Sequence, residues 1–332
     1  MRLKPKSRLI SGLVCLLGCT VNAPAISQDG APGPLPRTET GRPDFQGVWV
    51  TAVLTGLELD EDIASVRVAP EDVEAVTQVL AIRDEGVNDP DFLFENVTAL
   101  SVVNGEHRAA FIIQPESGLM PFTPWAEARA ELSDEYFYNG YDDPEQRSTS
   151  ERCISGTIAA PIRLLPLTIP NQIVQTDQHL VIRNEDVDSA RIIEIGGDAL
   201  PASMTSIGGH STAEWDGDTL VIRTANLRDD YPYREAGARS IQVTGASVVI
   251  ERLTMISPDE IHYAFTVEDP AIYAESWLGE FVMARSDVQV WEYACHEANY
   301  SLPNILKGGR AEQARRAEAS QSARSGRMLL RR

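Results

Sequence analysis

The sequence predicts a mainly β protein, either an antiparallel barrel or a barrel-like sandwich, with a few short peripheral helices. Two observations lead to this fold class. From residue 160 onward, runs of β-branched and aromatic residues follow one another with no helical pattern between them, which is typical of antiparallel sheets. Two-residue turn signals separate several of these runs. The strongest is Asp216-Gly217, a pair that favours the positive φ angles of a tight hairpin.

The expected elements follow from these patterns in chain order. Residues 47–49 begin a strand, and residues 70–83 have Pro and acidic residues before a helical repeat of apolar positions, which predicts a helix. Asn104-Gly105 marks a hairpin over 101–113, and residues 125–136 are expected to form a short helix. The remaining strands are expected at 172–185, 210–226, 247–269, 277–286 and 287–295.

Side-chain alternation assigns two faces to the hairpin at 210–226, with Trp215 expected opposite Asp218. One face is expected in the core and holds Ser211, Ala213, Trp215, Leu220, Ile222 and Thr224. The other face is polar and is either solvated or lines a lumen or cleft. Its candidate ligand-binding residues are His210, Glu214 and Arg223, with His210 opposite Arg223.

The hairpin at 247–269 is expected to pair Ile256 with Ile261 and Arg252 with Phe265 on a mainly apolar face. An unpaired charge buried there is too costly, so Arg252 has to stack on an aromatic ring or meet an acidic partner. Arg252 is therefore a structural residue or a second ligand-binding candidate.

The N-terminus has the pattern of an export signal, with basic residues ahead of an apolar run from Leu9 to Leu17 that is too short to span a bilayer. Leu16-Leu17-Gly18-Cys19 resembles a lipobox, which makes Cys19 a lipidated first residue, whereas Ala23 and Ala25 suit ordinary signal peptidase. Both alternatives predict an exported protein, located in the periplasm or held at the outer membrane as a lipoprotein. The expected organisation is an export signal (1–18), a flexible tether (19–42), one β-rich domain (43–306, with a more mixed part at 43–150) and a basic, helical or disordered tail (307–332).

Charge is unevenly distributed along the chain. The export segment contributes +4 and the tail +6 to the formal total of −20, so residues 19–306 carry −30. A body of this charge repels nucleic acid and anionic polysaccharides, which excludes them as partners. The lipid anchor is the only expected membrane contact.

Two cysteines remain once Cys15 and Cys19 are assigned to the export region. In an exported domain, Cys153 and Cys295 most simply pair with each other, so a disulfide is predicted between them.

Residues 293–300, YACHEANY, place a histidine and a glutamate beside Cys295. The zinc-protease pattern H-E-x-x-H fails because position 300 is Tyr300, and no other metal or cofactor motif is present, so no metal and no cofactor are predicted. Acid–base catalysis by His296, Glu297 and Tyr300 is one interpretation of this stretch. The alternative is that these residues bond the backbone where the chain leaves the sheet.

Several motifs in the same order resemble a widespread group of exported bacterial proteins without an established activity. They are RPDFQGVW, DDPEQRSTSERC, AEWDGDTLVIRT, VEDPAIY and EYACHEANYSLPNIL, within roughly residues 43–312. The resemblance implies a secreted β-rich domain with Cys153 and Cys295 paired. A second likeness, to lipocalin-type barrels, is carried by Gly47-x-Trp49. It implies that Trp49 plugs the closed end, with a late-strand arginine packed across it, for which Arg252 is the candidate.

These expectations lead to three hypotheses about the function. The first is an exported, lipid-anchored protein that binds a small molecule in a barrel cavity through Trp49, Arg252 and the polar face of the 210–226 hairpin. The alternative is a metal-independent lyase, hydratase or isomerase on the same scaffold. A third is an envelope scaffold held between its anchor and its basic tail.

Overall fold

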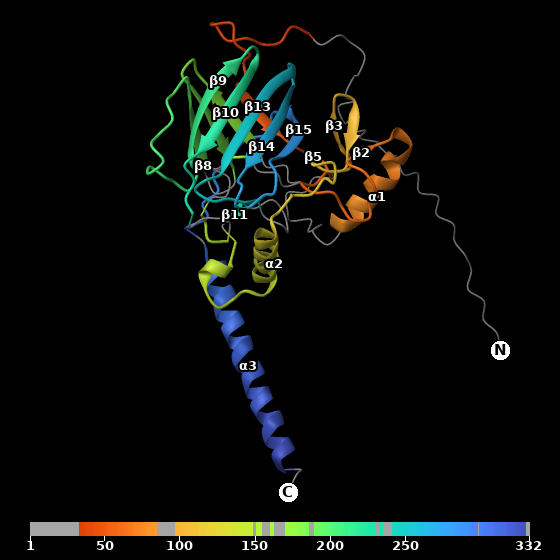
Figure 1. The fold of residues 1–332 in the computed structure, drawn as a ribbon, viewed down its shortest axis with the longest axis vertical. Coiled ribbons are helices and arrows are strands. Elements are labelled where there is room, and N and C mark those ends of the chain that lie inside the picture. Colours follow the sequence, from red (N-terminus) through yellow and green to blue (C-terminus); the bar gives the residue numbers. More distant parts are fainter. Residues whose placement is uncertain are drawn as a thin grey trace, which may run out of the picture.

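A computed structural model describes residues 33–84, 97–148, 151–154, 160–162, 170–185, 189–229, 233–234, 241–297 and 299–329 (Figure 1). Its main body is a closed barrel, as the sequence predicts. Nine strands pair in the order β1-β6-β7-β8-β9-β10-β13-β14-β15, and β15 pairs back to β1. Every neighbouring pair is antiparallel except β8 and β9, which run parallel.

The barrel strands have the following bounds: β1 (Gly47–Val50), β6 (Asn171–Gln175), β7 (His179–Asn184), β8 (Ser189–Ile195), β9 (His210–Asp216), β10 (Thr219–Ala225), β13 (Val248–Ser257), β14 (Glu260–Glu268) and β15 (Trp277–Ser286). A short strand, β5 (Ile112–Gln114), pairs with another part of β15. The strand expected at 287–295 is wrong, because residues 287–294 form no strand. β15 already pairs with β14 and β1, and residues 287–294 pass along the outside, where the Trp291 N–H donates to Glu185.

A smaller unit lies beside the barrel (Figure 1). It consists of the sheet β2-β4-β3 (Arg67–Val68, Glu106–Arg108, Ser101–Val103) with the 3-10 turn η1 (Pro70–Asp72) and the helix α1 (Val73–Asp84), as expected from the pattern at 70–83. The Asn104-Gly105 turn has positive φ at both residues, 52° and 78°, as a tight hairpin requires. Its own small core contains Leu54, Ile63, Val68, Leu80, Leu100 and Ala109.

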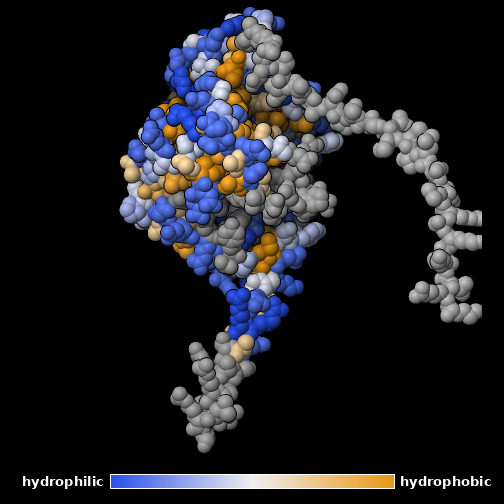
Figure 2. All heavy atoms as spheres, turned by 90° about the vertical axis from the view of Figure 1, so that its right-hand side faces the viewer, coloured by the Kyte–Doolittle hydropathy of each residue, from blue (hydrophilic) through white to orange (hydrophobic). Residues whose placement is uncertain are grey.

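The remaining helices and strands lie below the barrel in the view of Figure 1. Helix α2 (Pro124–Asn139) begins after Thr123, whose hydroxyl accepts from the Ala126 N–H, and η3 (Pro144–Gln146) precedes the disulfide. Strands β11 (Tyr233–Arg234) and β12 (Ile241–Gln242) form a two-stranded sheet. The long helix α3 (Ser301–Leu329) extends away from the body below α2 (Figure 1), and beyond its first turns it is strongly hydrophilic in Figure 2.

One end of the barrel is closed by residues 37–46, some of which the sequence places in the tether. Arg37 makes two hydrogen bonds to Asp218, at 2.6 and 3.0 Å, and Thr40 donates to Asp177. Arg42 lies 5.2 Å from the ring centre of Trp215. These contacts attach residues 37–42 to two hairpin turns of the barrel.

Strand register decides which side chains enter the barrel. In the β9–β10 hairpin, Leu220 pairs with Trp215, so the pairing of Trp215 with Asp218 expected from the sequence is wrong by one position on each strand. The faces are nevertheless as expected: Ser211, Ala213, Leu220, Ile222 and Thr224 are buried, and Trp215 packs against the core. Because the register moved by an even number, only the cross-strand partners changed.

In the β13–β14 hairpin, a β-bulge changes the faces themselves. Ser257 pairs with Glu260, as the sequence predicts, but Met255 pairs with Ile261, which leaves Ile256 as an extra residue. A one-residue shift moves the side chains of β13 that precede the bulge to the other face. The prediction that Arg252 and Ile256 lie on the mainly apolar face is therefore wrong. Val249, Glu251, Leu253 and Met255 are the buried residues.

Candidate functional site

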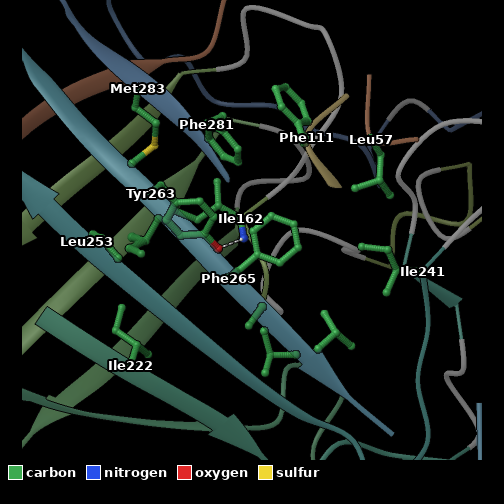
Figure 3. Packing of buried hydrophobic residues seen from close by; sticks show 14 of the residues in the cluster. Leu57, Phe111, Ile162, Ile222, Ile241, Leu253, Tyr263, Phe265, Phe281 and Met283 are labelled. Atoms are coloured by element: carbon green, nitrogen blue, oxygen red, sulfur yellow. Dashed lines mark hydrogen bonds between the residues drawn. The ribbon is translucent and has the colours of Figure 1, made fainter. Parts of the chain in front are cut away.

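A charged cluster lies inside the barrel, where the described lining is otherwise mostly apolar. It joins Arg191 of β8, Glu251 of β13 and Tyr263 of β14. Arg191 Nη2 donates to Glu251 Oε1 at 2.8 Å, and the Tyr263 hydroxyl donates to the same oxygen at 2.6 Å. The backbone N–H of Ile162 donates to the Tyr263 oxygen at 2.8 Å, as the dashed line in Figure 3 shows.

Two polar atoms of this cluster, Arg191 Nη1 and Glu251 Oε2, have no hydrogen-bond partner among the residues that the structure describes. Both side chains are almost completely removed from solvent, with exposed fractions of 6% and 0%. A buried polar atom without a partner costs about 1–3 kcal/mol, and more when it carries charge. Such atoms are rare in folded proteins, so each calls for a structural or functional explanation.

The electrostatics of the cluster favour the charged form of Arg191 and the neutral form of Tyr263. Burial opposes the charge on Arg191, but the neighbouring Glu251 carboxylate outweighs that effect and raises the pKa of the guanidinium. Burial, assisted by the negative charge of Glu251, raises the pKa of Tyr263 well above its usual range. Tyr263 therefore stays neutral and acts as a hydrogen-bond donor at physiological pH.

Aromatic rings pack around Tyr263, the member of the cluster that Figure 3 labels. The ring centre of Tyr263 lies 4.9 Å from that of Phe281 and 5.7 Å from that of Phe265, and Phe265 meets Trp277 edge-on at 5.5 Å. Gly279 on β15 is required here because a Cβ atom would collide with the Phe265 ring. The cluster is therefore held by side chains in fixed positions.

The closed end carries the arginine–tryptophan contact that the lipocalin likeness implies, but with a different arginine. Trp49 is fully buried, and its indole N–H donates to the Phe45 carbonyl at 2.9 Å. The guanidinium of Arg285 lies 4.3 Å from its ring centre and donates to the carbonyls of Gln46 and Pro258. The assignment of this role to Arg252 is wrong: the bulge turns Arg252 outward, where it forms an exposed 2.8 Å ion pair with Asp216.

The polar face of the β9–β10 hairpin lies outside the lumen. Glu214 and Arg223 are exposed, and His210 is half-buried with Nε2 3.3 Å from the Asp198 carbonyl oxygen. His210 pairs with Ala225 and Arg223 pairs with Thr212, so the expected pairing of His210 with Arg223 is wrong. The structure does not bring these ligand-binding candidates together with the lumen cluster.

The predicted disulfide between Cys153 and Cys295 is confirmed, and it joins positions 142 residues apart. Beside it, Asn299 donates to the Glu151 carbonyl at 2.8 Å and its Oδ1 accepts from the Leu302 N–H at the start of α3. His296, Glu297 and Tyr300 are exposed on this outer surface, and no side-chain hydrogen bond joins them in the described part of the chain.

A second charged cluster, missed from the sequence, lies between the barrel and the smaller unit. His262 Nε2 lies 3.2 Å from Glu280 Oε2, and Arg108 of β4 donates to Glu280 Oε1 at 3.1 and 3.2 Å. The hydrogen bond from His262, together with those from Arg108, lowers the pKa of Glu280. His262 keeps 24% of its side chain exposed, so this histidine–carboxylate pair is accessible to solvent.

No protein-family model matches the chain, and no curated protein matches its sequence. Across the described residues, no set of three His, Cys, Asp or Glu side chains is arranged to hold a metal ion. None of the described helices has the length and apolarity required to cross a membrane.

The signals for the lumen cluster were present in the sequence but masked by the register. Glu251 lies in a strand of alternating residues, and the register expected from the sequence turns its neighbour Arg252 inward instead of Glu251. Arg191 lies on β8, a strand that is not among those expected from the sequence pattern. A charged residue in each of two apolar strands is the signal that could have found the pair.

Proposed function

We propose that this protein is an exported, lipid-anchored protein of the cell envelope that binds a small molecule inside its barrel. The observation that carries the proposal is the pair of unpartnered atoms, Arg191 Nη1 and Glu251 Oε2, in the buried lumen cluster. Buried charges are normally fully bonded, so a pair with one free donor and one free acceptor fits a site that a ligand completes.

The location within the envelope rests on the N-terminal sequence, with its basic and apolar export pattern and its lipobox ending at Cys19. The confirmed disulfide supports it, because disulfides persist in oxidising compartments outside the cytoplasm. The resemblance to exported bacterial proteins, through motifs such as YACHEANY, agrees with the same location.

The proposal is tested by native mass spectrometry of the protein purified from its own host. A bound small molecule is expected in the wild type and should be lost from the double variant R191M/E251M, which removes both polar groups without leaving a lone charge. The matched control is D216N/R252M, which removes an ion pair with the same 2.8 Å separation from the outer face of the barrel. Equal ligand occupancy in both double variants would show that the molecule binds elsewhere.

A second candidate is a metal-independent acid–base enzyme, a lyase, hydratase or isomerase. The observation favouring it is the partly exposed His262 bonded to Glu280, because an imidazole that a carboxylate orients is a common general base. Incubation of any co-purified ligand with the protein should then add or remove water, or isomerise the ligand. The variant H262Q should abolish this turnover, whereas H179Q, which alters an exposed histidine, should retain it.

A further inference from the structure

A recess lies outside the lumen, at the closed end of the barrel. Its volume is about 280 Å³, just below the roughly 300–1,000 Å³ of most ligand pockets, so it has room for a small molecule. One wall is the segment 37–46, which lies above β9 and β10 in the view of Figure 1. The lining combines Thr40 and Arg42 of this segment with barrel residues that include Gln175, Asp177, Ile195 and Trp215.

Hydrogen bonds between the segment and the barrel hold the walls of this recess. Gln175 Oε1 accepts from the Phe45 N–H at 2.7 Å, and Gln175 Nε2 donates to the Pro43 carbonyl at 3.0 Å. Arg37 adds its two hydrogen bonds to Asp218 at the neighbouring hairpin turn. The recess is therefore formed in the ligand-free protein, so its walls need little further ordering on binding.

Two side chains of opposite charge line the recess, and both have bonding capacity left. Among the described residues, the only hydrogen-bond acceptor of the Arg42 guanidinium is the Gly217 carbonyl, at 3.2 Å, so most of its five N–H donors remain. Asp177 accepts from the Thr40 hydroxyl at 2.8 Å through Oδ1. Its Oδ2 accepts no hydrogen bond from the part of the chain that the structure describes.

A ligand with a single charge bonds only one of these two groups. A carboxylate bound to Arg42 shares the recess with the Asp177 carboxylate, and an ammonium group bound to Asp177 shares it with the guanidinium. A zwitterion makes a charge-assisted hydrogen bond to each of them.

The apolar part of the lining determines what else the ligand carries. Ile195 and Trp215 are partly buried and pack against the core, so they offer an apolar surface at the recess. Phe45 stacks on the Trp215 ring with the two planes within 6°, and Arg42 lies 5.2 Å from the ring centre. The ring face is therefore already in contact, which favours an aliphatic side chain at the ring edge over a sugar stacked on the ring.

We infer that this recess is a second binding site, separate from the lumen, for a small zwitterion of the α-amino-acid type with an apolar side chain. The carboxylate of the ligand binds Arg42 and its ammonium group binds Asp177. Its side chain contacts Ile195 and Trp215.

The inference is tested with three matched probes on the full-length protein. They are leucine, 4-methylpentanoate, which lacks the ammonium group, and 3-methylbutylamine, which lacks the carboxylate. Ligand-observed NMR titration gives the dissociation constants. Leucine is expected to bind at least about threefold more tightly than either analogue, since each solvent-exposed ion pair contributes modestly. Either analogue binding as tightly as leucine, or no saturable binding of leucine, would overturn the inference.

Two single variants locate the site. R42M should remove the advantage of leucine over 3-methylbutylamine, and D177N should remove its advantage over 4-methylpentanoate. The matched controls R67M and D62N change exposed residues of the smaller unit and should keep the wild-type order of the probes. A wild-type order in folded R42M and D177N would place the leucine site elsewhere and contradict the inference, and if either variant does not fold, the wild-type probe series still decides.

The outcome is independent of the lumen. The double variant R191M/E251M leaves the recess intact and should bind leucine as the wild type does. Loss of leucine binding in this folded variant would contradict a separate site, whereas absence of a co-purified ligand concerns only the lumen function.

Discussion

Removing one member of the buried pair should be far more damaging than removing both. In E251M, the charge of Arg191 remains in a position with 6% exposure and loses its 2.8 Å partner, and the Tyr263 hydroxyl loses its 2.6 Å acceptor. Breaking a buried ion pair in this way costs about 3–5 kcal/mol. The free energy of unfolding of E251M should fall by that amount.

The double variant R191M/E251M leaves no buried charge, and methionine fills a similar volume at both positions. Replacing a complete buried pair by apolar residues is often neutral or stabilising by about 1–4 kcal/mol. Removing both charges should therefore leave R191M/E251M at least as stable as the wild type. The Tyr263 hydroxyl loses its acceptor in this variant, which lowers the free energy of unfolding by about 1–3 kcal/mol. The surface control R252M/D216N removes an exposed pair and should cost about 0–1 kcal/mol.

Urea unfolding, followed by far-UV circular dichroism with the disulfide intact, measures these differences as shifts in the transition midpoint. The reasoning predicts the order of stability: control and double variant near the wild type, E251M well below both. A cost below about 1 kcal/mol for E251M would show that Arg191 reaches water or another partner, and the lumen assignment would then fail. A double variant as unstable as E251M would show that packing, and not the lone charge, dominates at this site.

Three further predictions concern other parts of the molecule. The pKa of Glu280 is lowered in the folded protein, first by the hydrogen bond from His262. The Glu280 carboxylate therefore stabilises the fold above its unfolded-state pKa, and this stabilisation is lost as pH falls through the lower folded-state pKa. Acid unfolding profiles of E280Q should therefore lack part of the wild-type loss of stability below about pH 4.5, and identical profiles would refute this linkage. Gly47 has φ +146° and faces the Arg285 guanidinium, so G47A should destabilise the protein by about 1–3 kcal/mol in the same urea assay, whereas G105A, also at positive φ but facing open space, should cost less. The variant C19S should move the protein from the membrane fraction to the soluble envelope fraction after cell fractionation, and a wild-type protein already soluble would show that signal peptidase cleaves after Ala25 instead.

Local patterns predict the class of this fold well, because alternation and turn signals act over a few residues. Asn104-Gly105 forms the expected hairpin, and the core face of the β9–β10 hairpin is the expected one. The parallel β8–β9 pairing was not predicted, since it depends on how distant strands meet around the barrel and not on a local signal.

The candidate site was predicted less well, for an identifiable reason. The assignment of site residues depends on the register of β13, and the extra residue Ile256 shifts that register by one, which exchanges the inward and outward faces of the strand. Arg252 was therefore assigned a role near Trp49 that Arg285 performs, and Glu251 was overlooked. Ion pairs such as that of Glu280 with Arg108 join residues that are far apart in sequence and leave no periodic pattern.

The bulge at Ile256 also has a consequence for how this barrel changes by mutation. On β13, a glutamate and an arginine are adjacent, and the bulge between them and the turn decides which one faces the lumen. Deleting Ile256 would remove the bulge and leave Met255 opposite Ile261 and Glu251 opposite Phe265, so the acid would keep facing the lumen. Regular pairing of Ile256 with Ile261 would instead place Arg252 opposite Phe265, so the bulge as well as the composition of β13 sets the sign of charge that this strand presents to the lumen.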